Sequence, residues 1–337
     1  FHCELAAAAL AAGARDRFAV AASEIERALV ADPAHPRAWT LRGQAALAEG
    51  RCENAIAAWR ELAAHSPLQR PAATGADDPG RFTRMAAAYE LLHMASLAHD
   101  DVVDHAFLRR GNASLNALWD NHAAVLGGDY LVARAVETLG EYGSCEIVTR
   151  AVRTVRAMAE CELAFFGVPA EAATEADCLR LAEGKTASLF AAACEAPALL
   201  AGDVDAADRL RRYGTAFGVA FQLMDDLLDL TQPPGETGKP ACGDITEGKA
   251  TVPLIRLRKA VTPEERNRLK ALSGAALTEE DIAWVRARLT ETGVAEEVGA
   301  LVAGHAEQAR ALALTFPASP CRDALAELTK VLVLRRN

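Results

Sequence analysis

The chain has 337 residues, which at roughly 150 residues per domain corresponds to about two domains. Hydrophobic residues make up 51% of it and charged residues 24%, so it can bury a sizeable core, and global disorder is excluded. Its 46 acidic residues outnumber its 36 basic ones, and the net charge of -10 argues against nucleic acid as a partner.

The cysteines and the apolar runs indicate the compartment. Eight cysteines lie far apart and form no Cys-x-x-Cys pair, which favours reduced thiols over zinc sites or disulfides. No stretch reaches the about 18 uninterrupted apolar residues of a membrane-spanning helix, and no signal peptide is visible. We therefore expect a soluble, cytoplasmic protein. Because the sequence begins with Phe1, we expect the natural N-terminus to lie further upstream.

The first 67 residues predict paired helices. Six residues fall at the spacings of a tetratricopeptide repeat: Trp39, Gly43, Gly50, Ala55, Trp59 and Pro67. Residues 21–33 resemble the second half of an earlier repeat, and the alternative is a generic alanine-rich helical hairpin. Such a segment is expected to pack on the rest of the chain or to continue upstream of Phe1, and it is a candidate binding site for a protein partner. Residues 68–80, rich in turn-forming residues, predict a linker to a second domain at 81–337.

Apolar residues beyond the linker recur at intervals of three and four, as in Met85, Ala88, Leu92 and Ala95. No alternating pattern of strand length appears, so the chain is predicted to be all-α. Within this helical pattern, Asp100 and Asp104 stand four residues apart on one face, with Asp101 beside them. Three carboxylates in one turn repel each other, so cations must neutralise them, and hard oxygen ligands suit magnesium.

A second acidic cluster occurs 125 residues later at Asp225, Asp226 and Asp229. Each cluster adjoins apolar sequence, so we interpret the two clusters as groups of carboxylates that face one cavity. Basic residues follow both clusters or lie between them: Arg109, Arg110, Lys185, Lys239 and Lys249. Magnesium and several cations together are suited to gripping a diphosphate. The implied chemistry is ionisation of a diphosphate leaving group beside an apolar cavity that shields the carbocation from water.

These motifs resemble those of the trans-isoprenyl diphosphate synthases, or polyprenyl synthases, over about residues 81–337. The stretches that match are 90–135 around the first cluster, GKTASLF at 184–190, FQLMDDLLDL at 221–230 and GKPACGDITEGKATVPL at 238–254. The resemblance implies an isoprenoid-synthase bundle of about ten helices around a deep apolar cavity. It also implies a magnesium-dependent prenyltransferase, expected as a homodimer, that joins isopentenyl diphosphate to an allylic diphosphate.

The resemblance gives each candidate residue a role. The magnesium ligands would be Asp100, Asp101, Asp104, Asp225 and Asp229. The catalytic residues beside the allylic diphosphate would be Lys185, Thr186 and Gln222. The other diphosphate-binding residues would be Arg109, Lys239 and Lys249 for the allylic substrate, and His93 and Arg110 for isopentenyl diphosphate.

The departures from the family pattern concern isopentenyl diphosphate. The usual Gly-Gly-Lys-Arg-x-Arg-Pro is reduced to residues 68–71, in which Arg70 is the one cation, and the usual Asp before Leu108 is Phe107. The usual Gly-Glu-x-x-Gln reads CELAF at 161–165, so a polar group is lost there. These changes predict weak binding of isopentenyl diphosphate. Two alternatives therefore stand beside the synthase: a cyclase-like enzyme that only ionises its substrate, and a regulatory subunit with a repeat-based interaction module.

The residues below the first cluster predict product length. In the family, the positions four and five before the first Asp form the floor of the cavity, and here they are Ser96 and Ala95. At 1.5 Å per residue they lie about 6 to 7.5 Å below Asp100. Both are small, which favours a medium or long product, and Tyr89, about 16 Å below, is the next candidate floor. The alternative is that both small residues only allow close helix packing.

Overall fold

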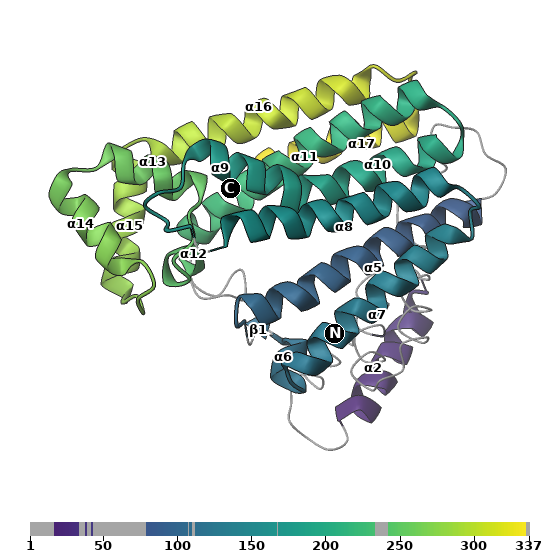
Figure 1. The fold of residues 1–337 in the computed structure, drawn as a ribbon, viewed down its shortest axis with the longest axis horizontal. Coiled ribbons are helices and arrows are strands. Elements are labelled where there is room, and N and C mark those ends of the chain that lie inside the picture. The colour runs from purple at the N-terminus through teal and green to yellow at the C-terminus, as the bar shows by residue number, and fades with distance from the viewer. Residues whose placement is uncertain are drawn as a thin grey trace. The chain divides into compact units, whose positions relative to one another are not determined.

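A computed structural model of the chain describes residues 17–33, 38, 42, 79–106, 108–109, 112–166, 168–232 and 242–334. It divides into two compact units, Phe1–Gly143 and Ser144–Asn337. Within the described residues, the only β-structure is one pair of two-residue strands, and all other regular elements are helical (Figure 1). The all-α prediction is therefore confirmed.

The first unit is built on two long helices, α5 and α7. Its elements are α2 (Arg17–Ala31), α5 (Pro79–Val103), β1 (Leu108–Arg109), β2 (Asn112–Ala113), α6 (Leu115–Leu118) and α7 (Asn121–Gly140). Helices α5 and α7 approach closely because Gly128 has no side chain: a Cβ there would lie 2.2 Å from Nε2 of His99. Asp120 caps α7 by accepting a hydrogen bond from the backbone N–H of Ala123 at 2.7 Å.

Helix α2 lies where the sequence predicts a helix, and it buries Ile25, Ala28 and Leu29 at helical spacing. The six residues that carry the tetratricopeptide prediction lie outside the described residues, and so does most of the predicted linker.

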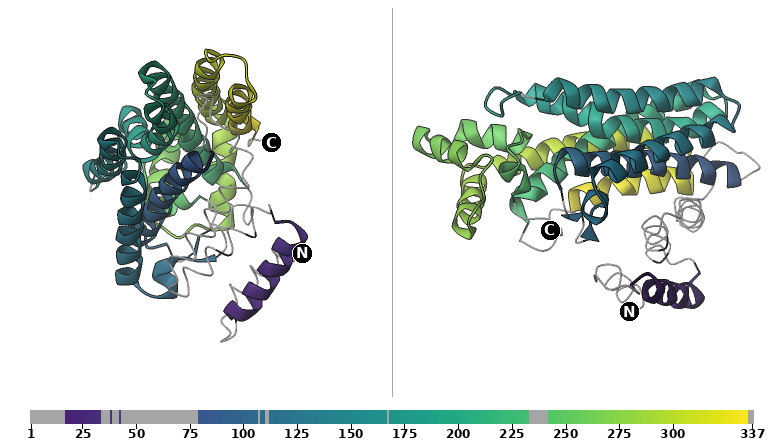
Figure 2. Two further views of the ribbon diagram at one scale, coloured as in Figure 1. Left: turned by 90° about the vertical axis from the view of Figure 1, so that its right-hand side faces the viewer. Right: turned by 60° about the horizontal axis from the view of Figure 1, so that its bottom comes forward.

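The second unit is a bundle around the long central helix α11 (Figures 1 and 2). Its elements are α8 (Cys145–Phe165), α9 (Glu175–Leu181), the π-helical turn η2 (Ala182–Ala187), α10 (Ser188–Leu200), α11 (Val204–Thr231), α12 (Gly243–Thr246), α13 (Val252–Ala260), α14 (Pro263–Leu272), α15 (Glu279–Glu291), α16 (Val294–Leu314) and α17 (Pro320–Leu334). Helix α11 packs mainly against α10 and α16. None of the described helices is long and apolar enough to cross a membrane.

Two glycines bring α11 into backbone contact with η2 and α10. A Cβ on Gly214 would lie 2.5 Å from the carbonyl oxygen of Phe190, and one on Gly218 would lie 2.4 Å from Cα of Ala187. Any larger residue at either position would push the helices apart. The register of α11 against η2 and α10 is therefore fixed by these two contacts.

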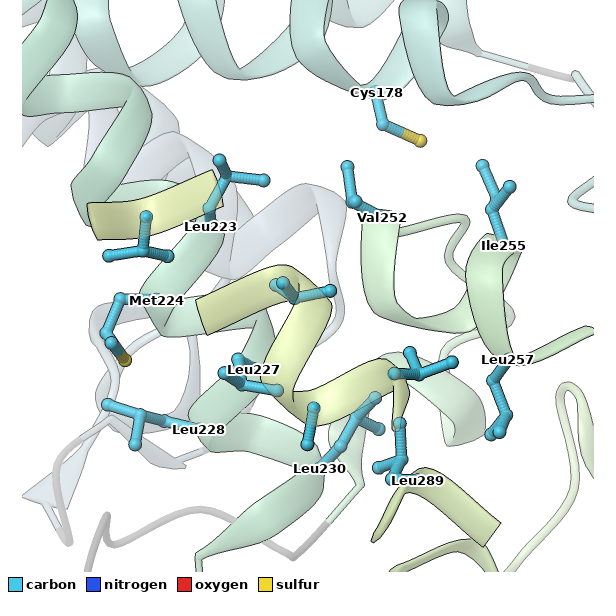
Figure 3. Packing of buried hydrophobic residues seen from close by; sticks show 14 of the residues in the cluster. Cys178, Leu223, Met224, Leu227, Leu228, Leu230, Val252, Ile255, Leu257 and Leu289 are labelled. Atoms are coloured by element: carbon cyan, nitrogen blue, oxygen red, sulfur yellow. The ribbon is translucent and has the colours of Figure 1, made fainter. Parts of the chain in front are cut away.

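The main core of this unit lies under the C-terminal half of α11 (Figure 3). It joins one face of α11 to α13 and α15 through Leu223, Met224, Leu227, Leu230, Val252, Ile255, Leu257 and Leu289. Burying each such side chain contributes about 1.5–3 kcal/mol. Because these leucines hold one face of α11 inward, Asp225, Asp226 and Asp229 are placed on the other face of the same turns.

Candidate active site

The first aspartate cluster occupies the C-terminal end of α5. Asp101 is buried, with 4% of its surface exposed, while Asp100 and Asp104 are half-buried. The helix ends in a Schellman motif, in which the N–H of Ala106 donates to the carbonyl of Asp101 at 2.9 Å. His105 adopts the left-handed conformation, with φ of 51°, which is uncommon for a residue other than glycine.

The segment after α5 holds this helix end in place. The side-chain amide of Asn116 donates to the carbonyl oxygen of Asp101 at 3.0 Å, and the hydroxyl of Ser114 donates to that of Ala106 at 2.7 Å. Between these contacts the chain turns through the β1–β2 pair, in which Arg109 is opposite Asn112. Arg110 and Phe107 lie outside the described residues.

Both acidic clusters stand at the unfavourable end of a helix. The C-terminus of a helix carries a partial negative charge that disfavours carboxylates. Asp100 and Asp101 lie in the last turn of α5, Asp225, Asp226 and Asp229 lie in the last two turns of α11, and neither helix has a basic residue in its last turn. Cations bound at both ends would offset this repulsion.

A π-helical turn carries two of the predicted catalytic residues. Lys185 and Thr186 lie in η2, and such turns are rare and frequent at functional sites. The Lys185 ammonium donates to the carboxylate of Glu162 on α8. Gly184 lies directly against Cys161, since a Cβ on Gly184 would be 1.9 Å from the Cys161 sulfur.

Thr186, Gln222 and Asp226 form a hydrogen-bonded chain between η2 and α11. The hydroxyl of Thr186 donates to Oε1 of Gln222 at 2.6 Å, and Nε2 of Gln222 donates to Oδ1 of Asp226 at 2.8 Å. Gln222 and Asp226 are four residues apart on one helix face. The structure thus brings together two predicted catalytic residues and the second aspartate cluster.

Two carboxyl groups in this region have strongly raised pKa values. Burial, together with the charges of Asp225 and Asp229, raises the pKa of Asp226 to about 7, against the lowering effect of its hydrogen bond from Gln222. Burial, then the charges of Asp226 and Asp229, raises the pKa of Asp244 well above its usual range. Crowded carboxyls of this kind are what a bound divalent cation would stabilise in the ionised form.

Asp229 has a further role in the turn after α11. Its Oδ1 accepts the backbone N–H of Gly243 at 3.1 Å, and its Oδ2 accepts that of Asp244 at 3.0 Å. The left-handed conformation of Cys242, with φ of 57°, aims these successive N–H groups at the carboxylate. Asp229 therefore holds the start of α12 beside the cluster, in addition to its predicted role as a metal ligand.

The other predicted residues lie in both units. The Lys249 ammonium pairs with Glu247 at 2.5 Å, and its backbone N–H donates to the carbonyl of Asp244 at 2.8 Å. Lys239 lies outside the described residues. On α5, His93 is half-buried, and its carbonyl accepts the Ser96 hydroxyl at 2.8 Å. On the same helix, Ala95 and Tyr89 are buried, with 1% and 5% of their surfaces exposed.

The donor set fits magnesium. Among the described residues, no three carboxylate, histidine or cysteine side chains already converge as an all-protein metal cage would require. Magnesium needs no such cage, because it is usually bound by one or two carboxylates together with substrate phosphates and water. Each cluster offers such carboxylates, and their repulsion at a helix C-terminus favours a cation.

Two residues of this site are not among the predicted site residues. Glu162 stands in the CELAF stretch, where the motif comparison indicates the loss of a polar group, yet its carboxylate is the partner of Lys185. Asp244 lies between Lys239 and Lys249, and an acidic residue between two predicted diphosphate ligands is the signal that could have found it.

Comparison with known proteins identifies the family. The profile described as Polyprenyl synthetase matches residues 62–288. The all-trans-nonaprenyl-diphosphate synthase (geranyl-diphosphate specific) of Rhodobacter capsulatus is 35% identical over 252 residues, 74% of this chain and 76% of that protein. The octaprenyl diphosphate synthase of Escherichia coli is 34% identical over 266 residues, 74% of this chain and 78% of that protein.

A solved structure agrees with these sequence matches. The polyprenyl synthase of Caulobacter crescentus, complexed with calcium and isoprenyl diphosphate, is 32% identical with a TM-score of 0.74, covering 100% of this chain and 94% of that one. The all-α bundle and the paired acidic motifs thus define a prenyltransferase of the isoprenoid-synthase fold. The chain belongs to the polyprenyl synthetase family. The comparisons give no support to a tetratricopeptide repeat in residues 1–67.

Proposed function

We propose that this chain is a magnesium-dependent synthase that condenses isopentenyl diphosphate with an allylic diphosphate to give a medium- or long-chain polyprenyl diphosphate. The observation that carries the proposal is the hydrogen-bonded chain from Thr186 through Gln222 to Asp226, with Lys185 on the same π-helical turn as Thr186. Relatives named nonaprenyl, octaprenyl and hexaprenyl synthases support the product class.

The metal ions would be held by Asp100, Asp101 and Asp104 on α5 and by Asp225 and Asp229 on α11. When bound, magnesium would supply positive charge to the diphosphate as it leaves. Because Ala95 and Ser96 on α5 are small, they would leave room for a growing chain below the first cluster.

The remaining residues act on the substrates directly. Lys185 would place its ammonium against the leaving diphosphate, where Arg109, Lys239 and Lys249 would also bind. The oxygens of Thr186 and Gln222 would steady the allylic cation after ionisation. His93 and Arg110 would hold isopentenyl diphosphate, and we propose a cytoplasmic homodimer as the working form. The tetratricopeptide interpretation of residues 1–67 carries no part of this proposal.

Product analysis with variants of both clusters tests the proposal. Asp101→Ala and Asp225→Ala should each abolish prenyl transfer and leave the circular dichroism spectrum unchanged, because removing one of several like charges relieves repulsion. The wild type should lose activity in EDTA and recover it with magnesium. Activity undiminished in EDTA, or in both variants, would refute the proposal.

The same assay decides between the synthase and its alternatives. A product formed equally well without isopentenyl diphosphate would show a cyclase-like enzyme instead. A relative named heptaprenyl diphosphate synthase component 2, from Geobacillus stearothermophilus, is 34% identical over 264 residues. Because that protein is named as a component of a synthase, an inactive purified chain would favour the subunit alternative. Activity of the chain alone would exclude it.

A further inference from the structure

We infer that Glu162 is a positioning residue for Lys185: its carboxylate holds the ammonium in the direction from which a diphosphate is gripped. This inference rests on the proposed function, and it concerns a residue outside the two aspartate clusters. Its basis is the contact between α8 and η2.

The two side chains meet where both helices are partly covered. Lys185 donates to Oε1 of Glu162, and the side chains are 27% and 35% exposed. Partial burial reduces screening by water, so this pair is held more firmly than the exposed pairs of α8, such as Arg156 with Glu160, where the side chains are 67% and 63% exposed. A lysine side chain left free would sample many rotamers, and the pair restricts them.

The backbone of η2 is shaped to make this contact. A π-helical turn widens the helix and changes the direction of the residues after it relative to a regular α-helix. Gly184, next to Lys185, lies on the Cys161 sulfur, next to Glu162, at a distance that no side chain would permit. The steric contact and the ion pair are therefore adjacent on both helices and fix the same register.

The ammonium can serve Glu162 and a diphosphate together. An ammonium has three N–H donors, so donation to one oxygen of Glu162 does not prevent donation to a diphosphate oxygen as well. Glu162 also offsets part of the positive charge of Lys185, so it weakens binding of a diphosphate while it directs the ammonium. Loss of the carboxylate should thus lower turnover without weakening diphosphate binding, a pattern that a purely structural defect would not give.

A double-mutant cycle tests the inference in the full-length chain. Glu162→Ala should lower kcat by about tenfold, which is within the range of coupling measured between residues in contact. In a Lys185→Ala background, the same change should lower kcat by less than about twofold. Glu162→Gln keeps an oxygen acceptor and should recover most of the turnover. The matched control is Glu160→Ala, an exposed residue of the same helix, which should leave kcat unchanged.

A binding measurement separates this inference from the proposed function. Inorganic diphosphate with magnesium, titrated by calorimetry, should bind Glu162→Ala and Glu162→Gln at least as tightly as the wild type, and Lys185→Ala more weakly. Equal losses of kcat in both backgrounds, no recovery with Glu162→Gln, or weaker diphosphate binding without Glu162 would each overturn the inference. A wild type without prenyl transfer would instead overturn the proposed function. The diphosphate titrations would still test the ion pair between Glu162 and Lys185.

Discussion

Gly184→Ala is expected to destabilise the wild-type protein and to stabilise a Cys161→Gly variant, because Gly184 lies against Cys161. In Gly184→Ala, the added Cβ would lie 1.9 Å from the sulfur and 2.9 Å from the Cβ of Cys161. The two helices must therefore separate, or Cys161 must move. Because Lys185 is the next residue, the displacement should also disturb its contact with Glu162.

The magnitude depends on two opposing effects. Forcing a methyl group into a packed site costs about 2 kcal/mol, and replacing a helical glycine by alanine regains about 1 kcal/mol. The net loss is about 1 kcal/mol, which lowers Tm by about 3 °C for a unit of this size. In Cys161→Gly both close atoms are gone, and the next neighbour of the new Cβ is the carbonyl oxygen of Ala157 at 3.5 Å, an ordinary contact.

The same Gly184→Ala change should therefore stabilise the Cys161→Gly protein by about 1 kcal/mol, a coupling of about 2 kcal/mol between the two sites. Thermal unfolding of the four proteins, with kcat measured beside it, gives the answer. Gly304→Ala in α16 is the matched control, because nothing lies within 4 Å of its new Cβ. A Gly184→Ala protein as stable and active as the wild type, or additive effects in the double variant, would refute the reasoning.

Two more predictions concern α5 and α10. Ala95→Phe should shorten the longest product and Tyr89→Ala should lengthen it, as judged by chromatography of the dephosphorylated products; an unchanged distribution with activity retained would mean that the chain grows elsewhere. Burial raises the pKa of the Glu195 carboxyl, although Arg150 at 3.8 Å opposes this. The native state therefore binds more protons than the unfolded state, so the free energy of unfolding should fall as pH rises above 4.5. Measured as Tm over a series of pH values, this fall should be present in the wild type and absent in Glu195→Gln. A wild type with no such fall would refute the prediction.

The sequence predicted those parts of the site that depend on spacing along one helix. Asp100 and Asp104 are four residues apart, and the N–H of Asp104 donates to the carbonyl of Asp100 as in a helix. The same spacing joins Gln222 to Asp226, a pair that was not predicted. The resemblance to the family assigned Lys185 and Thr186 to the diphosphate site, and both lie in the π-helical turn η2. None of these required knowledge of contacts between distant segments.

The rest depends on contacts between distant segments and on unusual backbone. The π-helical turn packs through Gly184 against the sulfur of Cys161 on α8, 23 residues earlier in the sequence. No local sequence pattern encodes such a contact. The binding of Asp229 to the start of α12 needs a left-handed Cys242, and sequence rules reserve that conformation mainly for glycine. In the sequence, Cys161 is visible only as a departure from the family motif. Its contact with Gly184 is recognised from the fold alone.

The glycines of α11 have a mechanical consequence. Where two helices touch through their backbones, neither can slide or part without losing contacts along several turns. Gly214 and Gly218 thus make η2, α10 and α11 one rigid wall, on which the hydroxyl of Thr186 and the amide of Gln222 keep a constant spacing. Because backbone meets backbone at both glycines, no bound molecule finds room between these helices there.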